Sequence, residues 1–201
     1  MHHAIRIDGN SLTDIQYYNN HLKPLIKRIT GRDVKVKFRK VGNCIFIMFE
    51  YKDFALFLNS NLGFPFGKKG EISIDKMLIK NQKYLIAVFR GLFDTDGCLY
   101  FTKNNSKERC YPIIEISTHS SALLNQLYQL LTELNFKVKI SHFKDSVKLH
   151  GKDNLIKFMQ FIGSNHPDKR SKFDYWAKFG YCPKIDELNF ESRMEKLNTG
   201  L

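Results

Sequence analysis

The sequence lacks every arrangement of cysteines that would hold a metal ion or build a disulfide framework. Its four cysteines, Cys44, Cys98, Cys110 and Cys182, are scattered through 201 residues with no C-x-x-C spacing and no paired histidines beside them. Zinc sites and disulfide scaffolds both need cysteines at short, characteristic spacings. We therefore expect buried thiols, and neither a zinc site nor a disulfide-rich domain.

Other features are also missing. There is no long apolar span and no amphipathic basic helix, so the sequence does not indicate a membrane partner. At the start of the chain, His2, His3 and Arg6 lead into a strand pattern where a signal peptide would have an apolar core, and from this we expect a cytoplasmic protein in a reducing compartment. A G-x-x-x-x-G-K-[ST] loop is absent, which argues against nucleotide hydrolysis.

Acidic residues are scarce relative to basic ones. The chain has 32 Lys and Arg against 20 Asp and Glu, a net charge of +12, and a pI of about 9.5. A surface this positive attracts polyanions, and its affinity for phosphate falls steeply with salt. We expect a nucleic-acid partner; a solubility surface or attraction to an anionic membrane is the alternative. With 43% hydrophobic and 13% aromatic residues, the chain is globular and long enough for one large domain or two small ones.

The chain contains an internal repeat. Hydrophobic periodicity predicts the same order of elements in both halves: strand, helix, two strands, helix. The first half gives residues 5–7, 12–29, 34–39, 44–50 and 51–62, and the second half gives residues 113–117, 120–134, 138–143, 146–150 and 152–162. Anchors coincide at an offset of 100, because Lys52-Asp53 matches Lys152-Asp153 and Gly63 matches Gly163.

The most informative stretch is LIAVFRGLFDTDG, residues 85–97, an apolar helix pattern that ends at Asp94 and Asp96. Small residues would let a second backbone approach closely, and Gly97 lets the chain turn away. Two such helices side by side would bring two carboxylates together, which suits magnesium because it binds carboxylate, water and substrate phosphate. The residues expected to form this helix pair are Leu85, Ala87, Val88, Gly91 and Leu92.

The segment FRGLFDTDG, followed by the strand-like Cys98-Leu99-Tyr100-Phe101, resembles the signature of the LAGLIDADG homing endonucleases. Asp96 falls on the metal-binding acid of that signature and Gly97 on its closing glycine. The resemblance covers residues 5–172 and implies an α/β (α+β) fold of two αββαββα-type repeats whose antiparallel sheets face DNA. By the spacing of the second repeat, the acid of the first would lie before Met1, so we expect the first repeat to be incomplete.

Four segments follow from this alignment. Residues 1–69 are the first repeat without its signature helix, 70–84 a linker, 85–180 a complete repeat, and 181–201 a C-terminal tail. Three possibilities remain for the missing helix. In the first, the 85–97 helices of two chains pair in a homodimer. In the second, a partner peptide or an upstream segment supplies the helix. In the third, the protein no longer cuts DNA and keeps only DNA binding.

The resemblance implies binding of an extended double-stranded DNA site with Mg²⁺-dependent phosphodiester cleavage. It assigns Asp96 and Gly97 to the metal and carries the family's lysine near the scissile phosphate to Lys68 or Lys69 and to Lys169; we take Asp96, Lys69 and Lys169 as catalytic. The alternatives are a cleavage-inactive, site-specific DNA-binding regulator and an RNA-binding protein of intron splicing, both within the same family.

DNA contacts are expected on the strands. In residues 34–39, alternation places Val34, Val36 and Phe38 on one face and three basic residues on the other, the pattern of a sheet packed on helices and facing an anion. Such a surface can lie in the major groove. The candidate DNA-binding residues are Arg6, Lys35, Lys37, Arg39, Lys68, Lys103, Lys107, Arg109, Glu115, Lys137, Lys139, Lys144 and Lys148.

Overall fold

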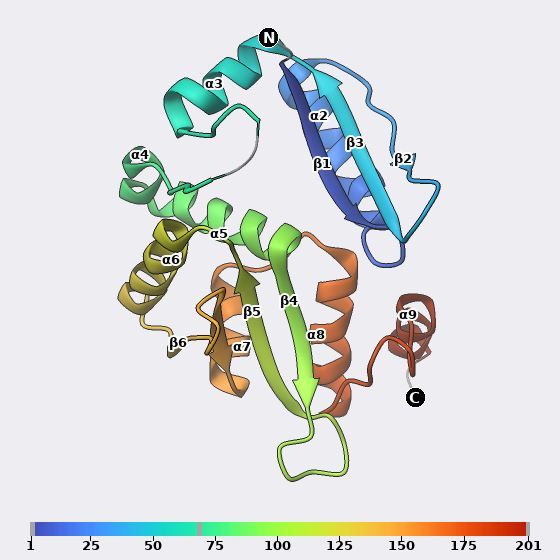
Figure 1. Cartoon of the computed structure of the whole chain (residues 1–201). Coiled ribbons are helices and arrows are strands. Elements are labelled where there is room, and N and C mark those ends of the chain that lie inside the picture. The colour runs from blue at the N-terminus through green and yellow to red at the C-terminus, as the bar shows by residue number, and fades with distance from the viewer. Residues whose placement is uncertain (1–2, 68–69, 200–201) are drawn as a thin grey trace. The chain divides into compact units, whose positions relative to one another are not determined.

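The computed structural model describes residues 3–67 and 70–199, which form two compact units (Figure 1). The described residues of the first unit are 3–67 and 165–167, and those of the second are 70–164 and 168–199. Each unit contains an antiparallel sheet with helices against it. This confirms the expected mixed α/β class.

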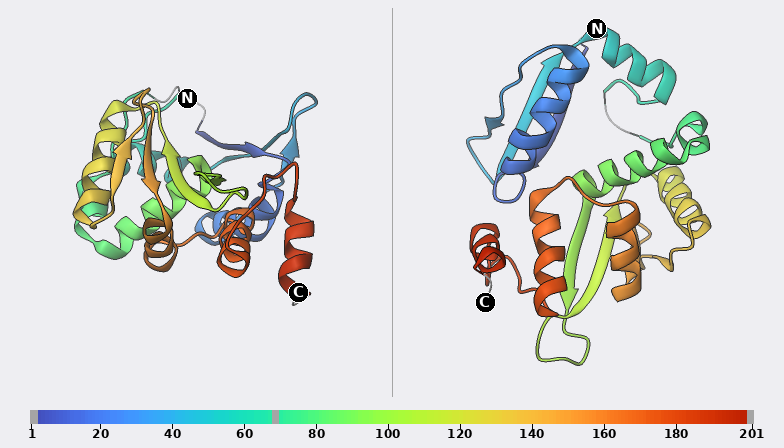
Figure 2. Two further views of the ribbon diagram at one scale, coloured as in Figure 1. Left: turned by 90° about the horizontal axis from the view of Figure 1, so that it is seen from below. Right: turned by 180° about the vertical axis from the view of Figure 1, so that it is seen from behind.

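The first unit consists of three strands and the helices that cover them. Its elements are β1 (Ala4–Asn10), α1 (Ile15–Tyr17), a π-helical turn η1 (Tyr18–Leu22), α2 (Lys23–Thr30), β2 (Lys37–Phe38), β3 (Cys44–Glu50) and α3 (Lys52–Leu62). The sheet order is β1-β3-β2, and all pairs are antiparallel. Alternate residues of β3, Ile45, Ile47 and Phe49, pack against Tyr18 and Ile26 of the helical segment. Views from the front and behind show α2 on one face of this sheet (Figures 1 and 2).

The strand predicted at residues 34–39 is much shorter in the structure. Only Lys37 and Phe38 pair with β3. Val34 is buried and Val36 is partly buried, as predicted, but Phe38 is 63% exposed. The prediction that all three pack inward was wrong for Phe38, which lies on a two-residue strand at the edge of the sheet.

The second unit has a four-stranded antiparallel sheet in the order β4-β5-β7-β6. Its elements are α4 (Lys76–Lys80), α5 (Gln82–Asp96), β4 (Gly97–Thr102), β5 (Tyr111–Ser117), α6 (Ser121–Glu133), β6 (Val138–Ile140), β7 (Ser146–His150), α7 (Lys152–Phe161), α8 (Pro167–Phe179) and α9 (Phe190–Asn198). Leu99, Ile114, Ile116 and Leu149 point from one face of the sheet into a core that the helices complete. Figures 1 and 2 show α7 and α8 on this face, which leaves the other face of the sheet open.

The predicted repeat is present in the arrangement of strands. The order β1-β3-β2 of the first unit is the order β5-β7-β6 of the second, and each set is followed along the chain by the same helix, α3 or α7. Residues 3–67 contain no counterpart of α5 or β4. Segments 70–84 and 181–201, predicted as a linker and a tail, contain α4 with the start of α5, and α9, respectively.

Helix α9 is held to α8 by a buried cation. Arg193 is fully buried, donates through Nε to the Ser171 hydroxyl at 2.9 Å, and forms an ion pair with Asp168. Lys172 contacts the same carboxylate at 2.8 Å. The sequence predicted only a C-terminal tail here, because periodicity gives no sign that an arginine points inward.

Cysteine burial differs from the prediction. Cys182 is buried, but Cys44 and Cys110 are half-buried and Cys98 is exposed, because it lies on the open face of β4. All four are free thiols. None of the helices within residues 3–67 and 70–199 is both long enough and apolar enough to cross a bilayer.

Candidate nucleic-acid interface and metal-binding acid

Helix α5 carries the principal candidate, Asp96, at its last position. The helix begins where the Asn81 side chain accepts hydrogen bonds from the backbone N–H groups of Lys83 and Tyr84, a standard N-cap. Leu85, Phe89 and Phe93 are buried at intervals of four residues and fix its inner face in the core of the second unit. The chain then enters β4 at Gly97.

Two side chains that follow α7 in the sequence hold the last turn of α5. Lys169, only 8% exposed, donates from Nζ to the backbone carbonyl oxygens of Phe93 at 2.5 Å and Asp94 at 2.9 Å. The buried Asp94 carboxylate accepts the hydroxyl of Ser164 at 2.5 Å. A cation is favourable at a helix C-terminus because the free carbonyl groups and the helix dipole are negative there. We call Ser164 and Lys169 the α5 clamp.

Gly97 is required by close approach and not by its backbone torsions. A Cβ at this position would lie 2.6 Å from the Phe93 carbonyl oxygen and 2.6 Å from its ring. The Gly97 N–H also donates to that carbonyl and closes the helix. The helix end is therefore fixed by contacts from Gly97 and Lys169 at once.

Asp96 itself is exposed, and its carboxylate accepts a hydrogen bond from the hydroxyl of its neighbour Thr95 at 3.2 Å. Across the described residues, no group of three or more His, Cys, Asp or Glu side chains is placed to hold a metal ion. Mg²⁺ is commonly bound by one or two carboxylates, with water and substrate phosphate completing its shell. A single exposed carboxylate on a fixed helix end fits that requirement as one half of a two-acid site.

The open face of the second sheet carries a row of polar side chains directly beside this acid. The strand register aligns Cys98, Glu115, Lys148 and Lys139 across β4, β5, β7 and β6. Glu115 accepts hydrogen bonds from Ser146 at 2.6 Å and from Tyr100 at 3.0 Å, and pairs with Lys148 at 3.2 Å. Partial burial raises the pKa of Glu115, but these three donors outweigh it and the net pKa is lowered.

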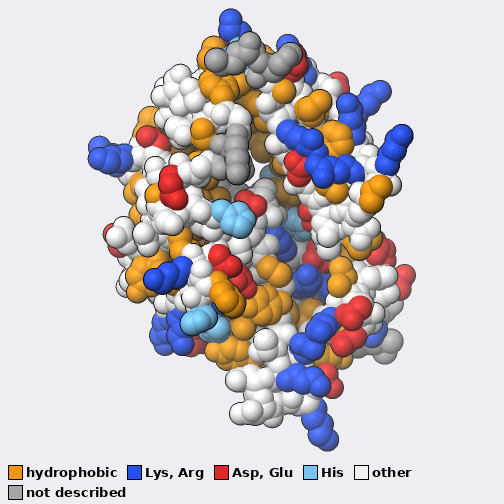
Figure 3. Space-filling view, viewed as in Figure 1, with side chains coloured by type: hydrophobic (Ala, Val, Ile, Leu, Met, Phe, Trp, Pro, Cys, Tyr) orange, Lys and Arg blue, Asp and Glu red, His pale blue; other side chains and the backbone are white. Residues whose placement is uncertain are grey.

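The first sheet has a comparable open face. Arg6 forms a two-pronged ion pair with Asp8, and its guanidinium stacks over the Phe46 ring at 4.4 Å. Arg39 reaches the same carboxylate at 3.4 Å, and Lys37 lies opposite Phe46 in the register. The space-filling view shows Lys and Arg side chains over this sheet, with acidic side chains between them (Figure 3).

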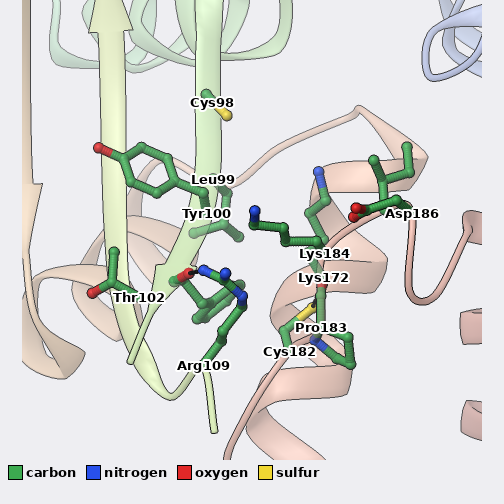
Figure 4. Close-up of a pocket in the computed structure, with 12 residues that line it drawn as sticks. Cys98, Leu99, Tyr100, Thr102, Arg109, Lys172, Cys182, Pro183, Lys184 and Asp186 are labelled. Carbon is green, nitrogen blue, oxygen red and sulfur yellow. Dashed lines mark hydrogen bonds between the residues drawn. The ribbon is translucent and has the colours of Figure 1, made fainter. Parts of the chain in front are cut away.

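A cavity of about 280 Å³ lies along β4 in the second unit (Figure 4). Residues 98–102 of β4 form one wall, and residues 182–186 form the other. Its cations are Arg109, Lys172 and Lys184, with Asp186 as its acid. One N–H of Arg109 donates to the Phe101 carbonyl at 3.3 Å, which fixes the guanidinium at the rim.

The structure brings some of the predicted DNA-binding residues together and separates others. Glu115, Lys139 and Lys148 share one face, and Arg6, Lys37 and Arg39 share another. Six others lie outside the strands, in the β4–β5 loop, before β2 or β6, or in the β6–β7 turn: Lys103, Lys107, Arg109, Lys35, Lys137 and Lys144. Lys68 and Lys69 lie outside the described residues.

One predicted interface residue needs correction. Leu85 is buried in the core beside Phe89 and Phe93, because positions 85, 89 and 93 fall on one side of α5. The exposed side of the helix contains Ala87 and Gly91, while Val88 and Leu92 are partly buried against the core.

Sequence reasoning did not identify the partners of these residues. Tyr100 and Ser146 fix Glu115, and Ser164 holds Asp94. The alternation of β4 did carry a signal for Tyr100, since residues 98 and 100 point to the face opposite Leu99. No local pattern marks Ser164, which acts on a residue 70 positions away.

Comparison with known proteins gives a consistent result. No curated protein sequence matches the chain. Residues 83–163 match the family described as the LAGLIDADG-like domain. This match spans α5 through α7 and contains the Asp96 segment.

Solved structures resemble a larger part of the chain. I-DmoI in complex with DNA and Ca is 16% identical, with 86% of this chain and 83% of that chain covered and a TM-score of 0.55. The I-LtrWI LAGLIDADG homing endonuclease bound to target DNA is 12% identical, covers 98% of this chain and 86% of its own, and has a TM-score of 0.53. I-DmoI was also solved with DNA and Mn, at 18% identity and a TM-score of 0.52 over 81% of this chain and 82% of that chain. Residues 83–163 therefore resemble the LAGLIDADG-like domain, and the chain has the fold of the LAGLIDADG homing endonucleases.

Proposed function

We propose that the protein binds an extended site on double-stranded DNA through the open faces of its sheets and cleaves it with a divalent metal, Mg²⁺ being the expected ion. The observation that carries this proposal is the position of Asp96. It ends α5 directly before β4, the strand whose next residues join the row of Cys98, Glu115 and Lys148. An acid fixed at the edge of a polar sheet face suits hydrolysis of a phosphodiester lying on that face.

Each residue in the proposed reaction has a defined task. Asp96 would hold the metal, and the α5 clamp would keep its carboxylate in place. A divalent metal held there would lower the pKa of a water molecule and would neutralise charge on phosphate oxygens. Lysines of the sheet faces would contact backbone phosphates, and Glu115, whose pKa is lowered, stays ionised as a hydrogen-bond acceptor for a base edge.

A second acid would come from a second copy of the chain, giving a homodimer. Gly91 lies on the exposed side of α5, and a Cβ there would meet no atom within 4 Å among the described residues. Ala87 is on the same side one turn earlier. Two α5 helices could approach closely along these small residues and place two Asp96 carboxylates side by side.

Gly91→Ala tests this pairing. In an isolated helix the change should be stabilising by about 1 kcal/mol, because alanine is the better helix former. In a close helix pair the added methyl group should weaken association instead. Light scattering and urea unfolding of the same variant separate the two effects: a more stable protein whose mass in solution falls from dimer to monomer supports the pair. A more stable variant of unchanged mass contradicts it.

The function is tested by selecting a target from a random-sequence duplex library and assaying cleavage with Mg²⁺. Asp96→Asn should abolish cleavage and retain binding, while Asp153→Asn, an exposed carboxylate in the first turn of α7, should leave both unchanged. Binding without cleavage in the wild-type protein would favour a site-specific DNA-binding regulator. Tighter binding to structured RNA than to duplex DNA would favour a role in intron splicing.

A further inference from the structure

The two most exposed large hydrophobic side chains in the described residues occupy equivalent places in the two units. Val41 is 86% exposed in the turn between β2 and β3, and Phe143 is 84% exposed in the turn between β6 and β7. The next most exposed, Leu12, is at 65%. Basic residues flank both: Arg39 and Lys40 precede Val41, and His142 and Lys144 surround Phe143.

The β6–β7 turn is rigidly built. Ser141 donates to the Asp145 carboxylate at 2.6 Å and accepts the backbone N–H groups of Asp145 and Ser146. The N–H of Lys144 donates to the Ser141 carbonyl at 3.0 Å, with Lys144 in the left-handed region at φ 54°. The Thr118 N–H donates to the Asp145 carbonyl at 2.8 Å and ties the turn to the end of β5. The His142 ring stands edge-on to the Phe143 ring, with centroids 5.5 Å apart.

A turn held this firmly does not need an aromatic residue at its tip. Turns favour Gly, Asn, Asp and Ser, because these residues satisfy local backbone geometry and water. Phe143 is held in solvent by a preorganised turn and has basic neighbours on both sides. Such a side chain can insert into a polyanion that has apolar surfaces inside it. Stacked base pairs behind a phosphate backbone have this chemistry, and apolar side chains wedged between base steps are a known mode of DNA binding.

We propose that the β6–β7 turn is a wedge that inserts Phe143 between adjacent base pairs of duplex DNA, with Lys144 contacting the backbone beside it. This rests on the proposed DNA-binding function. The β2–β3 turn presents Val41 in the same way but has a smaller side chain, so it contacts a groove without opening a base step. Flexible pyrimidine–purine steps are the ones that such a wedge opens at least cost.

The test measures DNA unwinding by the protein. Full-length protein is bound to nicked circular plasmid, the nick is sealed, the protein is removed, and the change in linking number is read from a gel. Wild-type protein should reduce the linking number in proportion to the amount bound. At equal occupancy, Phe143→Ser should lose this effect, and Phe143→Leu should retain most of it because leucine can also act as a wedge.

Affinity gives a second readout. For a random-sequence duplex, Phe143→Ser should bind roughly tenfold more weakly, the loss expected for one aromatic–base stack. Tyr128→Ser is the matched control, since Tyr128 is also an exposed aromatic residue but lies on α6 away from the turn. It should match the wild type in both assays.

The outcomes are distinct. Wild-type protein that binds plasmid without changing its linking number, or Phe143→Ser that unwinds as much as the wild type at equal occupancy, overturns the wedge and leaves the proposed function standing. Wild-type protein that binds neither plasmid nor linear duplex refutes the proposed function and the wedge with it.

Discussion

Replacing Lys169 with methionine removes the charged half of the α5 clamp while keeping most of the side-chain volume. In the wild-type protein the ammonium group donates to the carbonyl oxygens of Phe93 and Asp94, and it lies 5.0 Å from the centre of the Phe93 ring. After the change, the Phe93 carbonyl still accepts the Gly97 N–H. The Asp94 carbonyl loses the Lys169 hydrogen bond, so the damage falls on the turn immediately before Asp96.

The magnitude follows from this difference. A buried carbonyl that loses its partner costs about 1–3 kcal/mol. Removing a buried ammonium also removes the cost of desolvating it, and exchanges of buried charge for an apolar group of similar volume are sometimes neutral for that reason. Because this relief offsets part of the loss, we expect the free energy of unfolding to fall by about 1 kcal/mol, the lower end of that range. Displacement of Asp96 by about 1 Å would lower cleavage roughly 100-fold.

Urea unfolding and a Mg²⁺ titration of cleavage check both parts. Lys83→Met, an exposed lysine at the start of the same helix, is the control and should behave as wild type. The clamp predicts lower stability together with a higher Mg²⁺ requirement, since the misplaced carboxylate binds the ion less well. A variant of unchanged stability that nevertheless fails to cleave at any Mg²⁺ concentration would refute the clamp and support direct contact of Lys169 with phosphate.

Three further predictions concern the second unit. Gly97→Ala should lower stability by about 1–3 kcal/mol, because its Cβ would overlap the Phe93 carbonyl oxygen, and an unchanged midpoint in thermal melting would contradict this. Arg193→Met should cost about 3–5 kcal/mol by leaving the buried Asp168 with one partner fewer, and a loss below about 1 kcal/mol in urea unfolding would show that α9 is not anchored there. The pKa of Glu115 is lowered in the folded protein, so ionised Glu115 stabilises the fold. This contribution to the free energy of unfolding is present above the ordinary pKa of 4.5 and is lost as the pH falls through the folded pKa. Glu115→Gln should therefore flatten the acid side of the urea-midpoint profile, and an unchanged profile would contradict this assignment.

Much of the fold followed from periodicity and repetition. The strands at 44–50 and 146–150 were predicted at the residues where the structure has them, because alternation is strong in both and their neighbours are clear turns. The length of the strand at 34–39 was overestimated, because alternation indicates which side chains share a face but not how many residues pair with a neighbouring strand. The helices predicted at 51–62, 120–134 and 152–162 agree with α3, α6 and α7 to within one residue at each end, whereas α5 begins at Gln82, three residues before the predicted start.

Less of the candidate site could be predicted from the sequence. The position of Asp96 follows from a local motif, and so does its exposure at a helix end. The roles of Lys169 and Ser164 depend on contacts across 70 or more residues, which no local pattern records. Leu85 was misassigned for a different reason. An apolar helix has two sides, and only the packing of Leu85 with Phe89 and Phe93 shows which side is already buried in the core of the same chain.

The sheet of the first unit ends at β1, and within residues 3–67 that strand hydrogen-bonds only to β3. An unpaired strand edge is a template on which another extended chain can add, in a specific complex or in an aggregate. Charged side chains near such an edge make unselective addition less favourable, and the Arg6–Asp8 ion pair places both signs on β1. Self-association of the protein in solution should therefore depend on this ion pair as much as on its net charge. Salt that screens Arg6 and Asp8 should promote association at the same edge.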